Sequence, residues 1–237
     1  MSGELAGFGY QVQERGSRTA PSKFHRNFRC LTALLDRFQR IIDSDLLSQG
    51  QSILDYGCGN QPYASLFKKK FKHYVSADIV GNNDASLVLD PDGRLPTKDQ
   101  SFDCVLSSQV LEHVVSPEVY LDEAFRVLRT GGSLILSTHG IWPYHPDPCD
   151  FWRWTLDGLQ VQIRQAGFEI LKVQSVFGLE SSALQLWQDA TFERLPRLLQ
   201  PVYTGFFQLM IGLLERRHTD KISNDAAVYI VLARKPH

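Results

Sequence analysis

The sequence predicts an α/β protein built on a doubly wound, mostly parallel sheet of seven strands. Two observations carry this prediction. Short apolar runs alternate with helical or turn segments through the first two thirds of the chain, and the first of these runs ends in a glycine-rich turn. Strands that alternate with helices favour a parallel sheet that is covered by helices on both faces.

Composition indicates one large globular domain. The chain has 237 residues, of which 43% are apolar and 22% are charged, and such a chain can bury its own core. Its net charge of −1 supplies no basic field that would hold nucleic acid. The four cysteines form neither a CxxC pair nor a zinc-like cluster, which indicates free thiols in a reducing compartment. Without a secretion signal or a bilayer-long apolar run, the chain is expected to be cytoplasmic.

The predicted elements follow the chain in four units. Residues 1–50 combine an irregular lead-in with an amphipathic helix over Ser22–Asp43, capped by Ser22. Residues 51–178 form the α/β core, residues 179–224 a helical insert, and residues 225–237 the last strand. The core also holds a helix over Thr155–Ala166. The expected strands are Ser52–Asp55, Tyr74–Asp78, Ala85–Asp90, Phe102–Ser107, Ser133–Thr138, Phe168–Val176 and Ala226–Ala233.

The turn after the first strand contains Asp55, Gly57 and Gly59. Glycines at this place let the backbone turn sharply and approach a ligand at the edge of a doubly wound sheet. Asp78 ends the second strand near the spacing at which an acidic residue binds ribose hydroxyls. A dinucleotide site would require a third glycine where this chain has Pro62, so a pyrophosphate ligand is disfavoured.

Three stretches in this order carry a family resemblance: Ile53-Leu-Asp-Tyr-Gly-Cys-Gly59, the segment from Ser101 to Val114 with Leu-Glu-His-Val at its end, and Arg126-Val-Leu-Arg-Thr-Gly-Gly132. Together they resemble the class I S-adenosylmethionine-dependent methyltransferases. The resemblance implies a Rossmann-like fold with a terminal antiparallel hairpin, and S-adenosyl-L-methionine as cofactor. The Gln61-Pro62-Tyr63 variant of the turn is similar to members of glycan and cell-surface gene clusters.

The resemblance also implies roles for single residues. Asp55, Gly57 and Gly59 would contact the methionine end of the cofactor, and Asp78 would hold the ribose. The remaining cofactor residues implied are Ile79 and Asp90 beside the adenine, and Ser108 and Gln109 on the methyl-donating side. A purely structural interpretation makes Asp55 a helix cap and Asp78 a turn residue, and it leaves Glu112 and His113 to packing and capping.

A proline-rich loop follows the fifth strand and is similar to the His-Pro-x-Pro-x-Asp-x-Trp-Arg-x-Thr stretch of one methyltransferase branch. It lies at the carboxyl end of the sheet, where a second substrate binds. His145 is the first candidate for a catalytic base and His139 the second. Candidate substrate-binding residues are Trp142, Tyr144, Asp147, Asp150, Trp152 and Arg153. Alternatively, the tryptophans pack the next helix, Arg153 pairs with Asp150, and Thr155 caps the helix.

Methyl transfer from a sulfonium is an in-line displacement, so alignment is the main requirement and no metal is needed. A hydroxyl acceptor would benefit from a histidine base with a pKa near neutrality. The resemblance of the turn to members of glycan gene clusters, and a Trp-, Tyr- and Asp-rich loop that suits stacking on sugar rings, favour methyl transfer to oxygen of a glycan, glycolipid or related small polar acceptor. The alternatives are a lipophilic quinone-like or natural-product acceptor, and a cofactor-binding subunit without catalytic activity.

The insert carries an apolar face with helical spacing between Leu198 and Leu214, opposite a polar stripe of Gln200, Thr204, Gln208, Gly212 and Glu215. Such a face packs onto the core, forms a dimer or partner surface, or attaches to a membrane beside the flanking Arg194, Arg197, Arg216 and Arg217. We predict the first arrangement: a helical cap over the carboxyl end of the sheet that closes one wall of the acceptor site. A monomer or a homodimer, with or without peripheral membrane contact, is compatible with the sequence.

Overall fold

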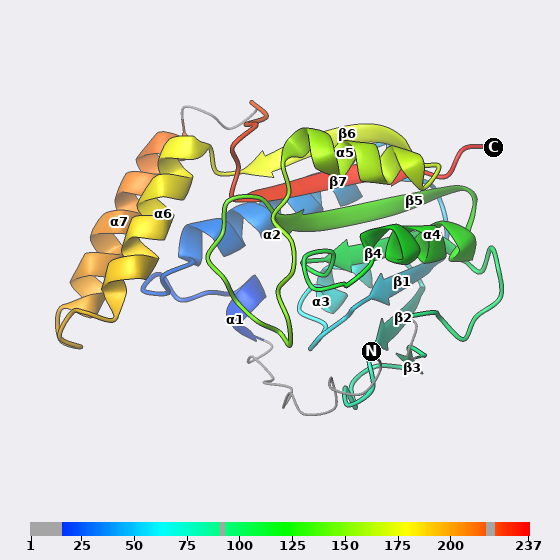
Figure 1. Ribbon diagram of the computed structural model, residues 1–237, viewed down its shortest axis with the longest axis horizontal. Helices are drawn as coiled ribbons and strands as arrows, with labels where there is room; N and C mark the ends of the chain where they lie inside the picture. Colours follow the sequence, from blue (N-terminus) through cyan, green and yellow to red (C-terminus); the bar gives the residue numbers. More distant parts are fainter. Residues whose placement is uncertain (1–15, 91–92, 217–220) are drawn as a thin grey trace.

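The computed structural model describes residues 16–90, 93–216 and 221–237. It contains one seven-stranded sheet in the order β3-β2-β1-β4-β5-β7-β6, in which β7 runs antiparallel to both of its neighbours (Figure 1). The predicted fold class is thereby confirmed. The strands are β1 (Ser52–Tyr56), β2 (His73–Asp78), β3 (Leu87–Val88), β4 (Phe102–Ser108), β5 (Leu128–His139), β6 (Glu169–Val176) and β7 (Val228–Arg234).

Helices cover both faces of the sheet, as Figure 1 shows. They are α1 (Gly16–Thr19), α2 (Phe28–Ile42), α3 (Ala64–Phe67), α4 (Pro117–Val127), α5 (Leu156–Gln165), α6 (Leu179–Phe192) and α7 (Gln200–Glu215). Side chains alternate along the central strands, so that Leu54 packs with α4 and α5 whereas Ile53 packs with α2 and α3. Two apolar cores therefore hold β1, β4 and β5 between them, and this fixes where the carboxyl ends of these strands meet.

Three predicted elements have clearly different bounds in the structure, and one of them is β5, which begins at Leu128 instead of Ser133. Helix α2 begins at Phe28 with Asn27 as its N-cap, because a turn closed by the His25 amide on the Ser22 carbonyl precedes it. Ser22 accepts a hydrogen bond from the Phe24 amide within this turn and does not cap the helix. The third strand is only two residues long, since it pairs solely with the end of β2.

The insert forms an antiparallel pair of helices, α6 and α7, and α7 also packs against α2. Helix α7 buries most of the predicted polar stripe and only part of the predicted apolar face. Thr204, Gln208 and Gly212 of the polar stripe are buried, whereas the apolar Val202 and Phe206 are 74% and 58% exposed. The predicted packing of the apolar face onto the core is therefore wrong for these two residues, although Phe207 of that face is buried.

Glutamine side chains explain this orientation. The side-chain amide of Gln208 donates to the Arg26 carbonyl (2.7 Å), and its oxygen accepts the Arg29 amide (2.8 Å). Gln208 thus supplies partners for the open backbone at the start of α2. Gly212 leaves room for the Arg29 side chain, because a Cβ there would lie 2.6 Å from the Arg29 guanidinium carbon.

Within the described ranges, none of the helices has both the length and the apolar character needed to cross a membrane. The lead-in over residues 1–15 and Arg217, one of the predicted flanking arginines, lie outside the described residues.

Candidate functional site

The glycine-rich turn after β1 has the tight geometry that its sequence predicts. Gly57 has a φ of +76°, and a Cβ on it would lie 2.6 Å from the Val110 side chain. The amides of Gly57 and Cys58 both donate to the Ala77 carbonyl, at 2.9 and 3.0 Å. The turn is therefore fixed against the end of β2, and only glycine fits at its first position.

Asp78, predicted to hold the ribose, stabilises this turn in the structure. Its Oδ2 accepts the Gly59 amide (2.9 Å) and the Asn82 side-chain amide (2.7 Å), and its Oδ1 accepts the Ile79 amide. The turn-residue interpretation is thereby confirmed. It does not exclude the ribose role, because a carboxylate offers about four acceptor positions.

Asp55 lies at the end of β1 and is 3% exposed. Its carboxyl group accepts a hydrogen bond from the Tyr74 hydroxyl. Burial raises the pKa of Asp55 to about 7, and the nearby Asp78 acts in the same direction against the Tyr74 hydrogen bond. Asp55 is therefore poised between its neutral and ionised forms at neutral pH.

The other predicted cofactor residues lie along the same edge of the sheet. Ile79, 42% exposed, follows β2, and Asp90 accepts the Arg94 amide after β3. Ser108 ends β4, and Gln109 follows it with a φ of +58°. The Gln109 side-chain amide donates to the Ser137 hydroxyl at 2.9 Å. A left-handed backbone at a residue other than glycine is strained, and such strain often occurs at functional sites.

On the acceptor side, the side chains of Glu112 and His139 are buried against each other. His139 Nδ1 lies 2.7 Å from Glu112 Oε1, and the Thr138 hydroxyl donates to Glu112 Oε2 at 2.8 Å. Burial opposes ionisation of Glu112, but the neighbouring His139 outweighs it and lowers the pKa of Glu112 to about 2. Glu112 Oε1 and His139 Nδ1 are close but not aligned, so neither atom has a hydrogen-bond partner among the described residues.

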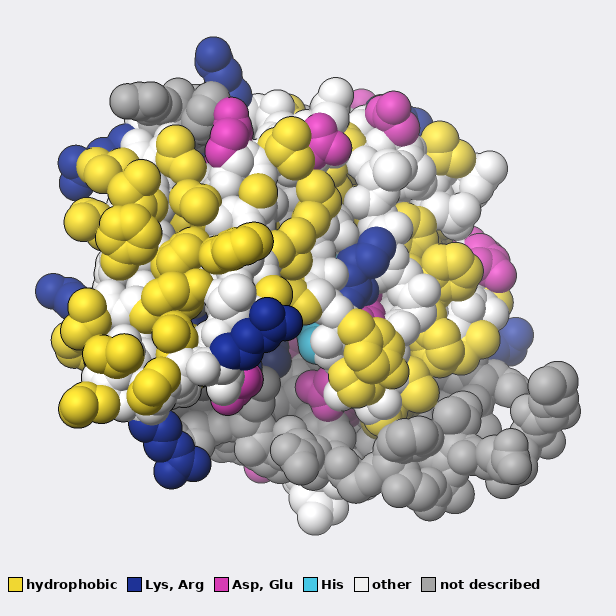
Figure 2. Space-filling model, turned by 60° about the vertical axis from the view of Figure 1, so that its left-hand side comes forward, with side chains coloured by type: hydrophobic (Ala, Val, Ile, Leu, Met, Phe, Trp, Pro, Cys, Tyr) yellow, Lys and Arg dark blue, Asp and Glu magenta, His cyan; other side chains and the backbone are white. Residues whose placement is uncertain are grey.

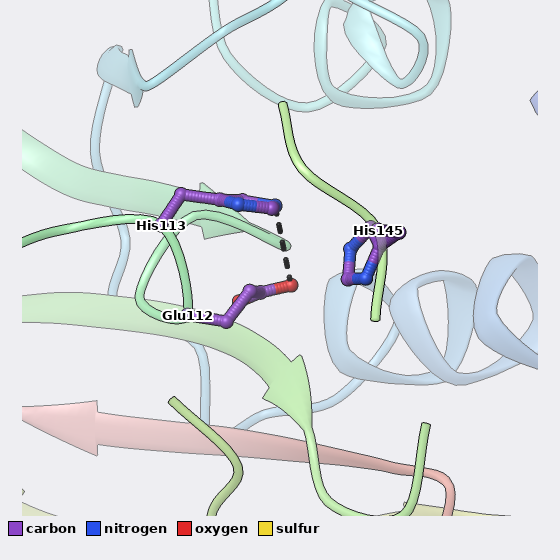
Figure 3. A group of neighbouring side chains, drawn as sticks. All are labelled: Glu112, His113 and His145. Carbon is purple, nitrogen blue, oxygen red and sulfur yellow. Dashed lines mark ion pairs between the residues drawn. The ribbon is translucent and has the colours of Figure 1, made fainter. Parts of the chain in front are cut away.

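Two further histidines surround this pair, and Figure 3 shows His113 and His145 on either side of Glu112. His113 Nδ1 lies 2.5 Å from the Cys149 carbonyl oxygen, and His145 Nδ1 lies 3.2 Å from that of Pro143. In a neutral ring, a nitrogen that faces a carbonyl donates to it, which leaves Nε2 of His113 as an acceptor. His145 Nδ1 also lies 3.4 Å from the Arg153 guanidinium.

His145 is a weaker base than the sequence suggested. Burial lowers its pKa to about 4, with His139 and His113 acting in the same direction against Asp150. The expectation of a near-neutral pKa for this residue is therefore wrong. Glu112, His113 and His145 also place possible ligand atoms within 4.8 Å of one another, a set that could hold a cation.

The proline-rich loop forms a shallow hollow of about 260 Å³ next to the histidines, lined by Trp142, Tyr144, Asp150, Phe151, Trp152 and Arg153. Asp147 is exposed on the same loop. None of these lining residues comes from the insert, so the predicted wall of helix is absent from this hollow. Figure 2 shows a histidine and charged side chains between two apolar areas of the surface.

Asp150 and Arg153 are paired as the structural interpretation predicted. Arg153 donates to both carboxylate oxygens of Asp150, at 2.6 and 2.5 Å. Burial opposes ionisation of Asp150, yet its hydrogen bonds to Arg153 and the His145 amide lower the pKa of Asp150 to about 2. The hydroxyl of Thr155 accepts the Gly158 amide and caps α5. This network makes the loop rigid and fixes the backbone around His145.

Comparison with known proteins identifies the family. Residues 24–173 match the profile of a family described as a methyltransferase domain. The chain belongs to the class I S-adenosylmethionine-dependent methyltransferases. Among curated relatives, the ubiquinone biosynthesis O-methyltransferase of Cereibacter sphaeroides is 29% identical over 43% of this chain and 46% of its own length. An uncharacterized methyltransferase of Mycolicibacterium gilvum is 31% identical over 54% of both chains. The chain thus spans about half the length of the curated relatives it matches.

Solved structures share the methyltransferase fold. The [4+2]-cyclase SpnF has 21% identity and a TM-score of 0.56, with 85% of this chain and 81% of that chain covered. A putative methyltransferase of Bacillus halodurans has 17% identity and a TM-score of 0.53, with coverage of 85% and 98%. At this level of identity the likeness shows the fold alone.

S-adenosyl-L-methionine is the methyl donor that family membership assigns to the methyltransferase. The residues at the strand ends fit it: the Gly57 turn leaves no room for a side chain, and Ile79 offers an exposed apolar surface beside a carboxylate. Glu112 is the site residue that sequence reasoning undervalued. Its place directly before His113 was visible, but only the structure shows that it meets His139 from the neighbouring strand.

Proposed function

We propose that the chain transfers a methyl group from S-adenosyl-L-methionine to a hydroxyl oxygen of a ring-bearing glycan or glycolipid. The observation that carries this proposal is the Glu112–His139 pair at the end of β5, next to a hollow lined by aromatic side chains. Aromatic faces suit the stacking of rings, and a histidine beside a carboxylate suits removal of a hydroxyl proton.

On the cofactor side, the proposal keeps the predicted contacts. Asp55, Gly57 and Gly59 would meet the methionine end, and Asp78 the ribose. Ile79 and Asp90 would flank the adenine, and Ser108 and Gln109 the methyl group. When bound, S-adenosyl-L-methionine supplies an electrophilic methyl group, and these residues hold it in line with the acceptor oxygen.

His139 is the stronger candidate for the base. The ionised Glu112 stands against its Nδ1 and would stabilise the imidazolium that forms when Nε2 takes the proton. His145, with its pKa lowered to about 4, would act mainly by accepting a hydrogen bond from the acceptor hydroxyl. Trp142 stacks on the His139 ring at a centroid distance of 4.9 Å and keeps it in place.

The second candidate acceptor is a lipophilic quinone-like phenol. Its support comes from the relatives, which include the ubiquinone biosynthesis O-methyltransferase and a demethylmenaquinone methyltransferase of Clavibacter sepedonicus that is 31% identical over 37% of this chain. A phenol ring would also stack in the aromatic hollow.

The test is a methyl-transfer assay with radiolabelled S-adenosyl-L-methionine and two acceptor sets, a glycolipid extract and a short-chain catechol. We expect label in the glycolipid set, lost in His139→Gln while calorimetry shows unchanged cofactor binding. Label only in the catechol would move the assignment to the quinone class. Binding of S-adenosyl-L-methionine without transfer to either set would contradict the proposed activity.

A further inference from the structure

The paired helices of the insert expose an apolar surface that is built from one face of each helix. On α6 this outer face carries Leu179, Ala183, Trp187 and Ala190, which are all exposed. On α7 it carries Val202, Phe206, Leu209 and Leu213, spaced four, three and four residues apart. We call these eight residues the outer face. Figure 2 shows the large apolar area on the side of the molecule where α6 and α7 lie.

The interior of the insert shows that this exposure is a property of the fold. The side-chain amide of Gln208 donates to the side-chain oxygens of Gln185 (3.3 Å) and Gln188 (3.0 Å), and that of Gln188 donates to the Arg26 carbonyl (2.9 Å). These amides occupy the positions between the helices and α2 where a soluble helix pair places its apolar residues. Rotating α7 to hide Phe206 would break this network and leave buried polar groups unpaired.

Charged side chains lie at the ends of the outer face, with three exposed arginines against two exposed glutamates. Arg194 and Arg197 are exposed in the connection between the helices, and Arg216 is exposed at the end of α7. Glu180 is exposed at the start of α6, and Glu193 is exposed and lies 3.6 Å from Arg26. Glu215 accepts the Gly178 amide. Helix α7 has no charged residue from Gln200 to Leu214.

We propose that the outer face of α6 and α7 docks on an anionic lipid bilayer. Its apolar side chains would enter the boundary between headgroups and acyl chains, and the arginines at its ends would meet anionic headgroups. A second copy of the chain is the alternative occupant, and the dimer outcome of the experiment below would identify it.

Docking in this way would place the acceptor hollow close to the membrane. A lipid-linked acceptor could then reach the histidines without leaving the bilayer. The docking itself does not depend on the proposed methyl transfer, since lipid binding is measured without cofactor or acceptor.

The experiment is co-sedimentation of the full chain with vesicles of phosphatidylcholine alone or with 30 mol% phosphatidylglycerol added. We expect binding to the anionic vesicles and at least about tenfold weaker binding by Val202→Glu/Phe206→Glu. Arg194→Gln/Arg197→Gln should bind both vesicle types equally, because it loses the preference for anionic lipid. Val161→Glu, which changes a 48% exposed residue on α5, should bind as the unchanged chain does.

Three results would overturn the proposal. One is recovery of the unchanged chain in the supernatant with both vesicle types. Another is equal loss of binding in Val161→Glu and in Val202→Glu/Phe206→Glu, with thermal unfolding confirming that both variants are folded. The third is a dimer in light scattering that Val202→Glu/Phe206→Glu dissociates, which would make the outer face an interface between copies.

Discussion

Asp55 on the cofactor side and Glu112 on the acceptor side are both buried carboxyl groups, and their pKa values are shifted in opposite directions. Burial raises the pKa of Asp55 to about 7, because its neighbours are a hydroxyl group and another carboxylate and none of them is a cation. Glu112 is buried equally well but faces His139, and its pKa falls to about 2. The comparison teaches that the charge partner decides whether a buried carboxyl group at a strand end is ionised.

The largest expected effect is the loss of catalytic rate when His139, the residue that faces Glu112, is replaced. His139→Ala should lower kcat by about 10²–10⁴, because it removes the proposed base, while leaving the affinity for S-adenosyl-L-methionine nearly unchanged. His145→Ala should cost only about tenfold, the contribution of one hydrogen bond. Steady-state kinetics with both variants ranks the two histidines. Equal losses would show that His145 shares the proton transfer.

The pKa of Asp55 predicts how stability changes with pH. The folded chain holds this proton up to about pH 7, whereas an unfolded Asp loses it near pH 3.8. The contribution of Asp55 to the free energy of unfolding is therefore fully present below pH 3.8 and is lost as pH rises through 7. The total loss is up to about 4 kcal/mol. Asp55→Asn should remove this loss, so its advantage in urea unfolding should be larger at pH 8 than at pH 5. A constant difference between these pH values would refute the assigned pKa.

The glutamine side chains of the insert form a buried polar network without charged groups, in contrast to the two carboxyl groups above. Gln208→Ala should lower the free energy of unfolding by about 2–3 kcal/mol, because the Arg26 carbonyl and the Arg29 amide lose a partner. Gln165→Ala, at an exposed position on α5, should change it by less than about 0.5 kcal/mol. Denaturant titration measures both. Indistinguishable values would mean that the network does not hold the insert.

The smallest effect is expected from metal removal. Glu112 is ionised beside His139 in this account, and no step requires a cation at Glu112, His113 and His145. Dialysis against a chelator should therefore change the methyl-transfer rate by less than about twofold. A rate that collapses and returns with added zinc or manganese would assign these three side chains to a metal.

The sequence predicted the mostly parallel sheet and the places of its strands along the chain, because alternating apolar runs depend on local chain geometry. It placed the cofactor and loop residues by motif, and the structure brings Asp55, Gln109, His139 and His145 to strand ends or the adjoining loop. Helix periodicity could not say which face of α7 turns inward, because Gln208 is satisfied by the backbone of a distant segment. It could not reveal the Glu112–His139 pair either, since that contact joins residues 27 positions apart.

The most direct test of the account is the single-turnover rate of Glu112→Gln, which keeps the size of the side chain and removes its charge. Cofactor affinity from calorimetry and thermal unfolding are measured on the same preparation. The account predicts a rate at least about 10²-fold below that of the unchanged chain, with S-adenosyl-L-methionine bound equally well. A rate within about twofold of the unchanged chain would contradict the role of the Glu112–His139 pair in methyl transfer.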